Sequence, residues 1–286
     1  METHPEVAAN VVAHRRVRRL SPRARARRAL VAASQVLAAL ALATGLAEGI
    51  LRLRHVGDFL VPKPSAVARS FAANEHLLWS HSLVTLREVV IGFAVAAAGG
   101  FLLAVLITYV PALARFVYPL VVASQTIPKI AIAPLLVVWF GFGLMPKIIV
   151  VFLIAFFPVV IASAVGLGSV DQNMLHLVRS MGASPLQAFL KVRLIHAVPS
   201  VYSGLKIAIT LSVVGAIVGE FVGADAGLGY LLLIANGRID TPLMFAVVIV
   251  LAVMGVSLFG LVSALERITP GHLRVQGRGR ATVEGL

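Results

Sequence analysis

Side chains with the chemistry to act on a ligand are few and scattered in this 286-residue chain. His76 and His81 lie five positions apart, whereas histidines that share a metal from one helix face usually lie three or four apart, so a solvated surface is favoured over a metal site. Cysteine is absent, which excludes thiolate chemistry, disulfides and cysteine-bound metal. No phosphate-binding Gly-x-x-x-x-Gly-Lys-Ser/Thr loop, His-Glu-x-x-His or Gly-x-Ser-x-Gly motif occurs. We therefore expect a chain that is not an enzyme, does not hydrolyse ATP and binds no cofactor or metal of its own.

Two lysines interrupt long apolar runs. Lys206 follows Pro199 by seven residues, about 10 Å along a helix, so its ammonium group can reach the membrane surface and we interpret it as structural. Lys129 lies thirteen residues after Phe116 and directly after Pro128, which predicts a broken helix at a depth of about 20 Å that lines a cavity. A cation there would either attract an anionic substrate or bind a backbone carbonyl freed by the break.

Small residues recur at every fourth position in two segments. They are Gly92, Ala96, Gly100 and Ala104, and separately Gly215, Gly219, Gly223 and Gly227. Such spacing lets helix backbones approach closely, which fits packing within the chain, a self-association seam or the lining of a transport path. Lys129, Gly215, Gly219 and Glu220 are the residues we would place on such a path, although Glu220, beside Asp225, is better explained as a helix cap. No carboxylate is expected deep inside a span, where a proton relay would need one.

A polar segment, Asp171–Pro199, separates two apolar runs. The pairs with capping-box spacing are Ser169 with Gln172 and Ser184 with Gln187. Pro185 stands at the favoured first position of the second helix, and Gly182 lies where a helix end requires positive φ. The segment therefore predicts a helix–glycine–helix element outside the bilayer.

This element carries an apolar face. Its residues are Met174, Leu175, Leu177, Val178 and Met181. The spacing is that of one side of a helix, which fits either docking in a partner's groove or packing onto the protein's own spans.

The composition is that of a membrane protein: 59% of the residues are hydrophobic, 13% are charged and the mean hydropathy is +0.95. The net charge of +13 includes eight arginines between Arg15 and Arg28. A polybasic flank beside a membrane helix accounts for these arginines better than a nucleic-acid arm does.

Six apolar runs are long enough, at about 20 residues each, to cross a bilayer. They are Ala29–Ala47, Val89–Ala114, Phe116–Pro146, Ile148–Val170, Val198–Gly219 and Pro242–Leu265. The first is too long for a signal peptide. We thus expect a basic tail over 1–28, a six-span domain over 29–268 that includes the loop 171–197, and a tail over 269–286.

Lysine and arginine set the orientation of these spans. With the N-terminus in the cytosol, sixteen of them fall on the cytoplasmic side and seven, Lys147 among them, on the other. The positive-inside bias therefore places both termini and the loop 171–197 in the cytoplasm.

The polar segment resembles the cytoplasmic signature loop of bacterial ABC importer permeases, the binding-protein-dependent inner-membrane components. In that family a Glu-Ala-Ala triplet is followed by a glycine and then by Ile-x-Leu-Pro. Gly182 matches the glycine, and Val192 and Leu194 match the Ile and Leu. The triplet is replaced by His176, Leu177 and Val178, and the proline by Ile195, while Pro199 matches a second proline of one branch.

That branch is similar to the importers of nitrate, taurine, aliphatic sulfonates and pyrimidine-type vitamin precursors. The motifs that carry the similarity are IPKIAIAPLLVVWFGFG at 127–143, FFPVV at 156–160 and GEFVGADAGLGYLL at 219–232. The resemblance covers the chain from about Val61 to Arg267.

The resemblance implies an all-α, polytopic protein with six transmembrane helices and a cytoplasmic coupling helix, like an ABC type I importer permease in a bacterial inner membrane. It implies a homodimer, an ATPase dimer that binds ATP and Mg, and an extracytoplasmic substrate-binding protein. The residues expected to dock on the ATPase are His176, Arg179, Met181, Gly182, Ala183, Ser184 and Pro185.

The sequence leaves the solute open. Lys129 favours a small anion of the sulfonate, taurine or nitrate type, and a pyrimidine or thiamine-type precursor is the alternative. A secondary transporter that needs no ATPase is the rival from another class, and paired acids inside the spans would favour it.

Overall fold

The computed structural model describes residues 35, 38, 39, 42, 44–46, 48–54, 57 and 60–269. The expected tail 1–28, the last seventeen positions of the expected C-terminal tail and most of the run Ala29–Ala47 therefore lie outside the described residues. The chain divides into two compact units, Met1–Val56 and Gly57–Leu286.

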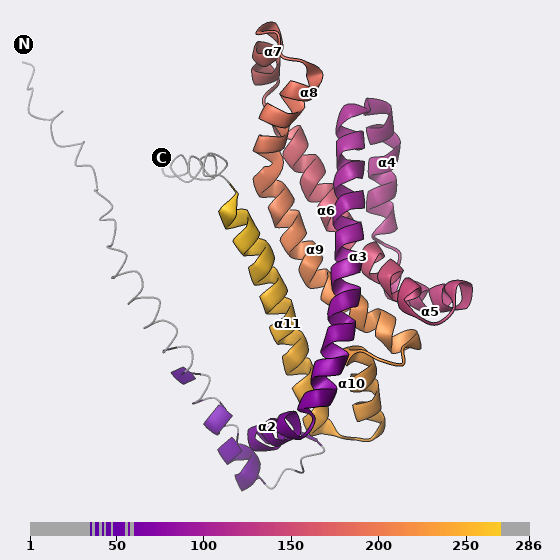
Figure 1. The fold of residues 1–286 in the computed structure, drawn as a ribbon, viewed down its shortest axis with the longest axis vertical. Helices are drawn as coiled ribbons and strands as arrows, with labels where there is room; N and C mark the ends of the chain where they lie inside the picture. The colour runs from indigo at the N-terminus through magenta and orange to yellow at the C-terminus, as the bar shows by residue number, and fades with distance from the viewer. Residues whose placement is uncertain are drawn as a thin grey trace, which may run out of the picture. The chain divides into compact units, whose positions relative to one another are not determined.

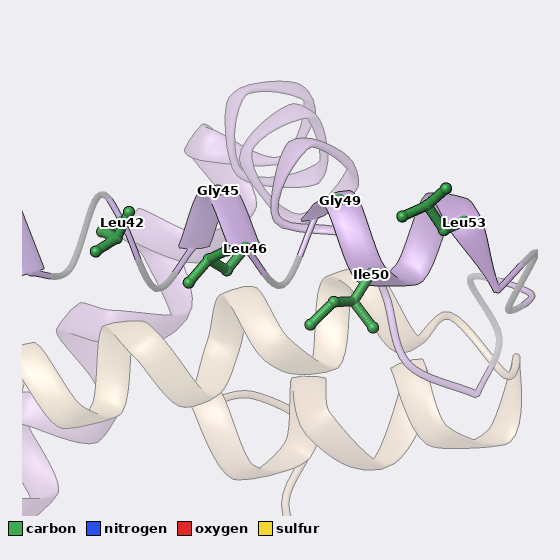
Figure 2. A pocket seen from close by; sticks show the side chains of 6 residues that line it. All are labelled: Leu42, Gly45, Leu46, Gly49, Ile50 and Leu53. Atoms are coloured by element: carbon green, nitrogen blue, oxygen red, sulfur yellow. The ribbon is translucent and has the colours of Figure 1, made fainter.

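The described part of the first unit is helical from residue 42 to residue 53 wherever it is described. One side of this helix is apolar, with Gly45 and Gly49 between larger side chains (Figure 2). The six residues on that side are Leu42, Gly45, Leu46, Gly49, Ile50 and Leu53. Glu48 and Arg52 form an ion pair of 2.7 Å one turn apart.

The second unit is built of helices over its described residues. Their bounds are α2 Pro64–Ala73, α3 Glu75–Tyr109, α4 Pro111–Ser124, α5 Lys129–Phe140, α6 Leu144–Gly168, α7 Gln172–Ser180, α8 Pro185–Ala188, η1 Phe189–Arg193, α9 Leu194–Gly223, α10 Leu228–Gly237 and α11 Thr241–Ile268. The predicted all-α class is confirmed for this part of the chain.

Long helices form a bundle with two different ends (Figure 1). α6 packs along both α3 and α9, and α11 packs on α9. The short helices α7 and α8 project at one end of the bundle, whereas α2 and α10 lie at the other.

Among the described residues, four helical stretches are long and apolar enough to cross a membrane. They are Glu75–Tyr109, Leu144–Gly168, Pro185–Gly223 and Thr241–Ile268. They match four of the six predicted runs. The first helix begins fourteen residues before Val89, because it includes a segment of mixed polar and apolar residues ahead of the apolar run.

The expected single run Phe116–Pro146 is two helices, α4 and α5, separated at Gln125–Pro128. Pro128 has no N–H to continue a helix and disfavours a helical residue before it, so α5 starts afresh at Lys129. The predicted break beside Lys129 is confirmed. Gly141 and Gly143, both with positive φ, then separate α5 from α6.

The small-residue ladders pack within the chain, and both meet α6 at Val151. A side-chain carbon added at Gly92 of α3 would lie 2.4 Å from Val151 Cγ1, and one added at Gly215 of α9 would lie 2.9 Å from Val151 Cα. Each helix can reach α6 this closely only because hydrogen replaces a methyl group there.

Gly215→Ala is therefore expected to lower stability by about 1–3 kcal/mol, because the new methyl group meets backbone that cannot rotate away. Thermal unfolding in detergent would measure the change. Gly255→Ala is the matched control, since nothing lies within 4 Å of its added carbon; an equal loss in both variants would contradict this packing account.

Candidate functional site

The helix–glycine–helix element begins with a capped α7. The Asp171 side chain accepts a hydrogen bond of 2.8 Å from the Asn173 N–H, so Asp171 is the N-cap of α7. The predicted Ser169–Gln172 capping box is wrong: Ser169 ends α6, and its hydroxyl donates to the Gly166 carbonyl. Three residues separate the two helices, with Ser169 at the end of α6 and Asp171 at the start of α7.

The turn after α7 follows the prediction closely. Gly182 has φ of +85°, and its N–H donates to the Arg179 carbonyl while the Ala183 N–H donates to the Val178 carbonyl. These bonds satisfy the carbonyls at the end of α7. A side-chain carbon added at Gly182 would meet nothing within 4 Å. An L-residue there would therefore be strained only by the positive φ of the backbone.

The second helix opens with the predicted capping box. The Ser184 hydroxyl accepts from the Gln187 N–H at 3.2 Å, and the Gln187 side chain accepts from the Ser184 N–H at 3.0 Å. Pro185 occupies the first turn. Two N–H groups that a helix start leaves unpaired are thereby satisfied.

The apolar face of the element divides into a buried residue and an exposed patch. Leu175 is 2% exposed, so it packs inward as the alternative interpretation predicts. We call the exposed group the α7–α8 patch; its members are Met174, Leu177, Met181 and Leu186. Met181, 78% exposed, lies at the turn. Exposed apolar side chains grouped on one short element are typical of a partner contact.

The other residues predicted to dock surround this patch. His176, Arg179, Gly182, Ser184 and Pro185 are exposed and Ala183 is half-buried. The structure thus brings the predicted set together on one short element, and their contact with a partner stays a prediction.

α8 continues without interruption into α9, one of the candidate membrane-spanning helices. A π-helical turn, Phe189–Arg193, leads from α8 into α9, so residues Pro185–Gly223 form one helical stretch. The α7–α8 patch is therefore attached directly to the core of the bundle.

The residues predicted to line a translocation path do not form one group. Lys129 lies with its ammonium 4.4 Å from the centre of the Phe157 ring, and Phe157 is ten residues, about 15 Å, along α6 from Lys147. Gly219 lies against Lys147, whereas Glu220 is 1% exposed. Their assignment to a path stays a prediction.

A buried polar cluster at the α10 end of the bundle includes Glu220. The Lys147 ammonium donates to Glu88 Oε1 at 2.8 Å, and the Thr85 hydroxyl donates to Glu220 Oε1 at 2.6 Å. Glu88 and Lys147 are 1% and 4% exposed. Contrary to expectation, two acids lie within candidate spans, but at the α10 end of the bundle: Glu220 is three residues before the end of α9, and Lys147, counted from the sequence on the outer side, is the fourth residue of α6. An acid pair at one end of the bundle is not the relay through the spans that a secondary transporter would need.

The cluster also holds the start of α10. The N–H groups of Gly227, Leu228 and Gly229 donate to His81 Nδ1, Thr85 Oγ1 and Glu220 Oε2 at 2.9, 2.8 and 2.5 Å. His81 is thus a structural acceptor, and Glu220 caps the next helix rather than the end of its own span. Glu88 and Thr85 escaped the sequence analysis, although Glu88 directly borders an uncharged run.

Lys206 has the structural role predicted for it. Its ammonium donates to Glu266 Oε2 at 2.5 Å, which ties α9 to α11. Both side chains are partly exposed, so the pair adds little stability by itself.

These features define a helical protein with four stretches long and apolar enough to cross a membrane among its described residues, and with the short α7–α8 element fused to one of them. A family model for the binding-protein-dependent transport system inner membrane component matches residues 92–269. The chain belongs to this family, the permease components of ABC importers, and the resemblance inferred from its motifs is confirmed.

Relatives support the same assignment. A probable ABC transporter permease protein of Haemophilus influenzae is 41% identical over 70% of this chain and 82% of the relative. The formylaminopyrimidine transport permease protein ThiX of Halalkalibacterium halodurans is 38% identical over 75% of this chain and 87% of the relative. Permease proteins named for aliphatic sulfonates and for taurine also match, at about 30% identity.

The fold matches a solved structure of the MetNI methionine ABC transporter in an inward-facing conformation. The TM-score is 0.61 at 22% identity, over 68% of this chain and 96% of the matched chain. This likeness supports the arrangement of the bundle.

The capping box predicts a local effect of Ser184→Ala. Loss of the hydroxyl acceptor leaves the Gln187 N–H unpaired and should weaken α8 by about 1 kcal/mol. Hydrogen–deuterium exchange would then rise about fivefold at Gln187. Ser180→Ala, whose hydroxyl donates only to the His176 carbonyl, should leave that amide unchanged, and equal rates in wild type and Ser184→Ala would contradict the capping box.

Proposed function

We propose that this chain is the transmembrane subunit through which an ATP-driven importer moves a small solute, with the α7–α8 element as its coupling helix. The observation that carries the proposal is the exposed α7–α8 patch, built around a positive-φ glycine and continuous with α9. An apolar helix face of this size fits a hydrophobic groove on a partner.

The partner would be an ATPase dimer that binds ATP and Mg. Closure of the ATPase would move the α7–α8 element, and α9 would transmit the movement to α6 and α3, because these helices are packed too closely to slide independently. The element and both termini would then lie in the cytoplasm of a bacterial cell, as the distribution of lysine and arginine predicts.

A second copy of the chain would complete the path. The solute would pass between the two copies by alternating access, after delivery by an extracytoplasmic substrate-binding protein. Such a two-state permease responds to its loaded binding protein only if that protein binds one state more tightly than the other.

Gly182→Asp tests the coupling role. We expect the variant to remain in the membrane but to lose at least about nine-tenths of uptake, because the side chain strains the turn and projects into the docking surface. Gly168→Asp is the control: it adds the same charge near the same end of the bundle, at a position with no positive φ and nothing within 4 Å. Normal uptake by Gly182→Asp would rule out the proposal.

A pull-down in mild detergent tests the partner directly. We expect a near-equimolar ATP-binding subunit with wild type and with Gly168→Asp, and much less with Gly182→Asp. A clean homodimer without an ATPase, together with uptake that vanadate does not inhibit, would favour a secondary transporter instead.

Lys129 tests the solute class. If the solute is a small anion, Lys129→Met should raise the KM for uptake of a sulfonate such as taurine about tenfold, the loss of one charge-assisted contact. Uptake of formylaminopyrimidine would be the comparison. An unchanged KM for the sulfonate, with uptake of the pyrimidine, would favour the vitamin-precursor alternative.

A further inference from the structure

The polar cluster at the α10 end carries more acid than base. Glu88 of α3 and Glu220 of α9 bring two carboxyl groups, and Lys147 of α6 brings one ammonium group; all three side chains are nearly inaccessible to solvent. With both acids ionised, the cluster would hold an uncompensated negative charge in an apolar bundle. Such a charge is strongly unfavourable unless it binds a proton or a counter-ion.

One carboxylate oxygen in this cluster has no partner. Glu88 Oε1 accepts from Lys147, but Glu88 Oε2 is buried and receives no hydrogen bond. Thr85, which donates to Glu220, lies one turn before Glu88 on α3, and Lys147, which donates to Glu88, lies against Gly219 next to Glu220. The two carboxyl groups are therefore neighbours in the cluster. Two ionised carboxylates offer only acceptors to each other, whereas a protonated one supplies the missing donor.

We propose that the Glu88–Glu220 pair is a binding site for one proton, carried on Glu220 and donated to Glu88 Oε2. Lys147 then balances the ionised Glu88, and the cluster is neutral. The proton completes the hydrogen bonding of Glu88, while the Glu220 oxygens continue to accept from the Thr85 hydroxyl and the Gly229 N–H. The site belongs to the chain itself and does not depend on the proposed transport function.

The groups that face this pair come from every adjoining element. They are His81 and Thr85 on α3, Lys147 on α6, Asp225 in the turn after α9, and the N–H groups that begin α10. Asp225 adds a negative charge near Glu88, but Asp225 is exposed, so solvent screens that charge. Lys147 opposes retention of the proton, but its one ammonium group is already bound to Glu88.

Loss of the proton would loosen the anchor of α10. Two adjacent carboxylates would repel each other across the contact of α3 with α9, and Glu220 also holds Gly229. The folded protein retains a proton that an exposed carboxyl group of the unfolded chain releases in the ordinary acidic range. The folded state therefore binds more protons above that range, so stability is full at low pH and falls as pH rises.

Glu220→Gln is the decisive variant, because an amide is the neutral isostere of a protonated acid. The new amide NH2 group donates to Glu88 Oε2. If the Thr85 hydroxyl loses its acceptor at position 220, it can donate to the His81 carbonyl, 3.3 Å away. We expect a Tm within about 3 °C of wild type at neutral pH. Glu88→Gln removes the carboxylate to which the buried Lys147 ammonium donates, so its Tm should fall by about 10 °C. Asp225→Asn, at an exposed acid, is the control.

Infrared difference spectroscopy of the purified full-length protein detects the proton itself. Wild type minus Glu220→Gln should show the C=O band of a protonated carboxylic acid at neutral pH, with the expected shift in deuterium oxide, and wild type minus Asp225→Asn should not. The Tm of wild type should also fall as pH rises above the ordinary acidic range of a carboxyl group, by more than that of Glu220→Gln. Absence of the band, or a loss in Glu220→Gln as large as in Glu88→Gln, would overturn the proposal.

Discussion

The close approach of α3 and α9 to α6 is the constraint on which the rest of the molecule depends. Both helices reach α6 at Val151, where Gly92 and Gly215 leave room for it and an added carbon would overlap. Apolar side chains gain little from leaving lipid for one another, so a membrane bundle is stabilised by the van der Waals contact that small residues permit. A bundle fixed in this way behaves as one body, and its two ends can carry different functions without separate domains.

The two ends of the bundle satisfy the backbone groups of their helix termini in different ways. At the α10 end, three N–H groups that begin a helix are buried and must find acceptors; His81, Thr85 and Glu220 supply them. At the α7–α8 end, the backbone satisfies itself through Asp171, the Gly182 turn and the Ser184 box. That self-sufficiency leaves Met174, Leu177 and Met181 free to face outward. An element whose helix ends are satisfied by its own residues can offer these apolar side chains to a partner, while Leu175 packs inward.

Local chemistry was predictable from the sequence where one residue decides it. Gly182, Pro128 and the Ser184–Gln187 pair each have an effect that depends on neighbours in the chain, and the structure has them as predicted. Glu88, Lys147 and Glu220 stand far apart in the sequence, and only packing brings them together. In the sequence each of them lies at the edge of an apolar run, where a charged side chain is usually solvated. The sequence therefore did not indicate that they would meet. The predicted Ser169–Gln172 capping box was wrong for a local reason: Asp171, two residues later, offers a carboxylate acceptor that caps α7 instead.

One helical stretch connects the two ends. Pro185–Gly223 begins at the Ser184 box, passes through the π-helical turn and Pro199, and ends three residues after Glu220. At 1.5 Å per residue it spans about 55–60 Å. The π turn and Pro199 are where such a helix bends most easily, and both lie in its α8-proximal half. Beyond them, Gly204, Gly215 and Gly219 hold the helix against α6. A displacement of α8 would therefore be absorbed partly at the bend, and the remainder would reach α6 and the Glu220 cluster as movement of a rigid rod.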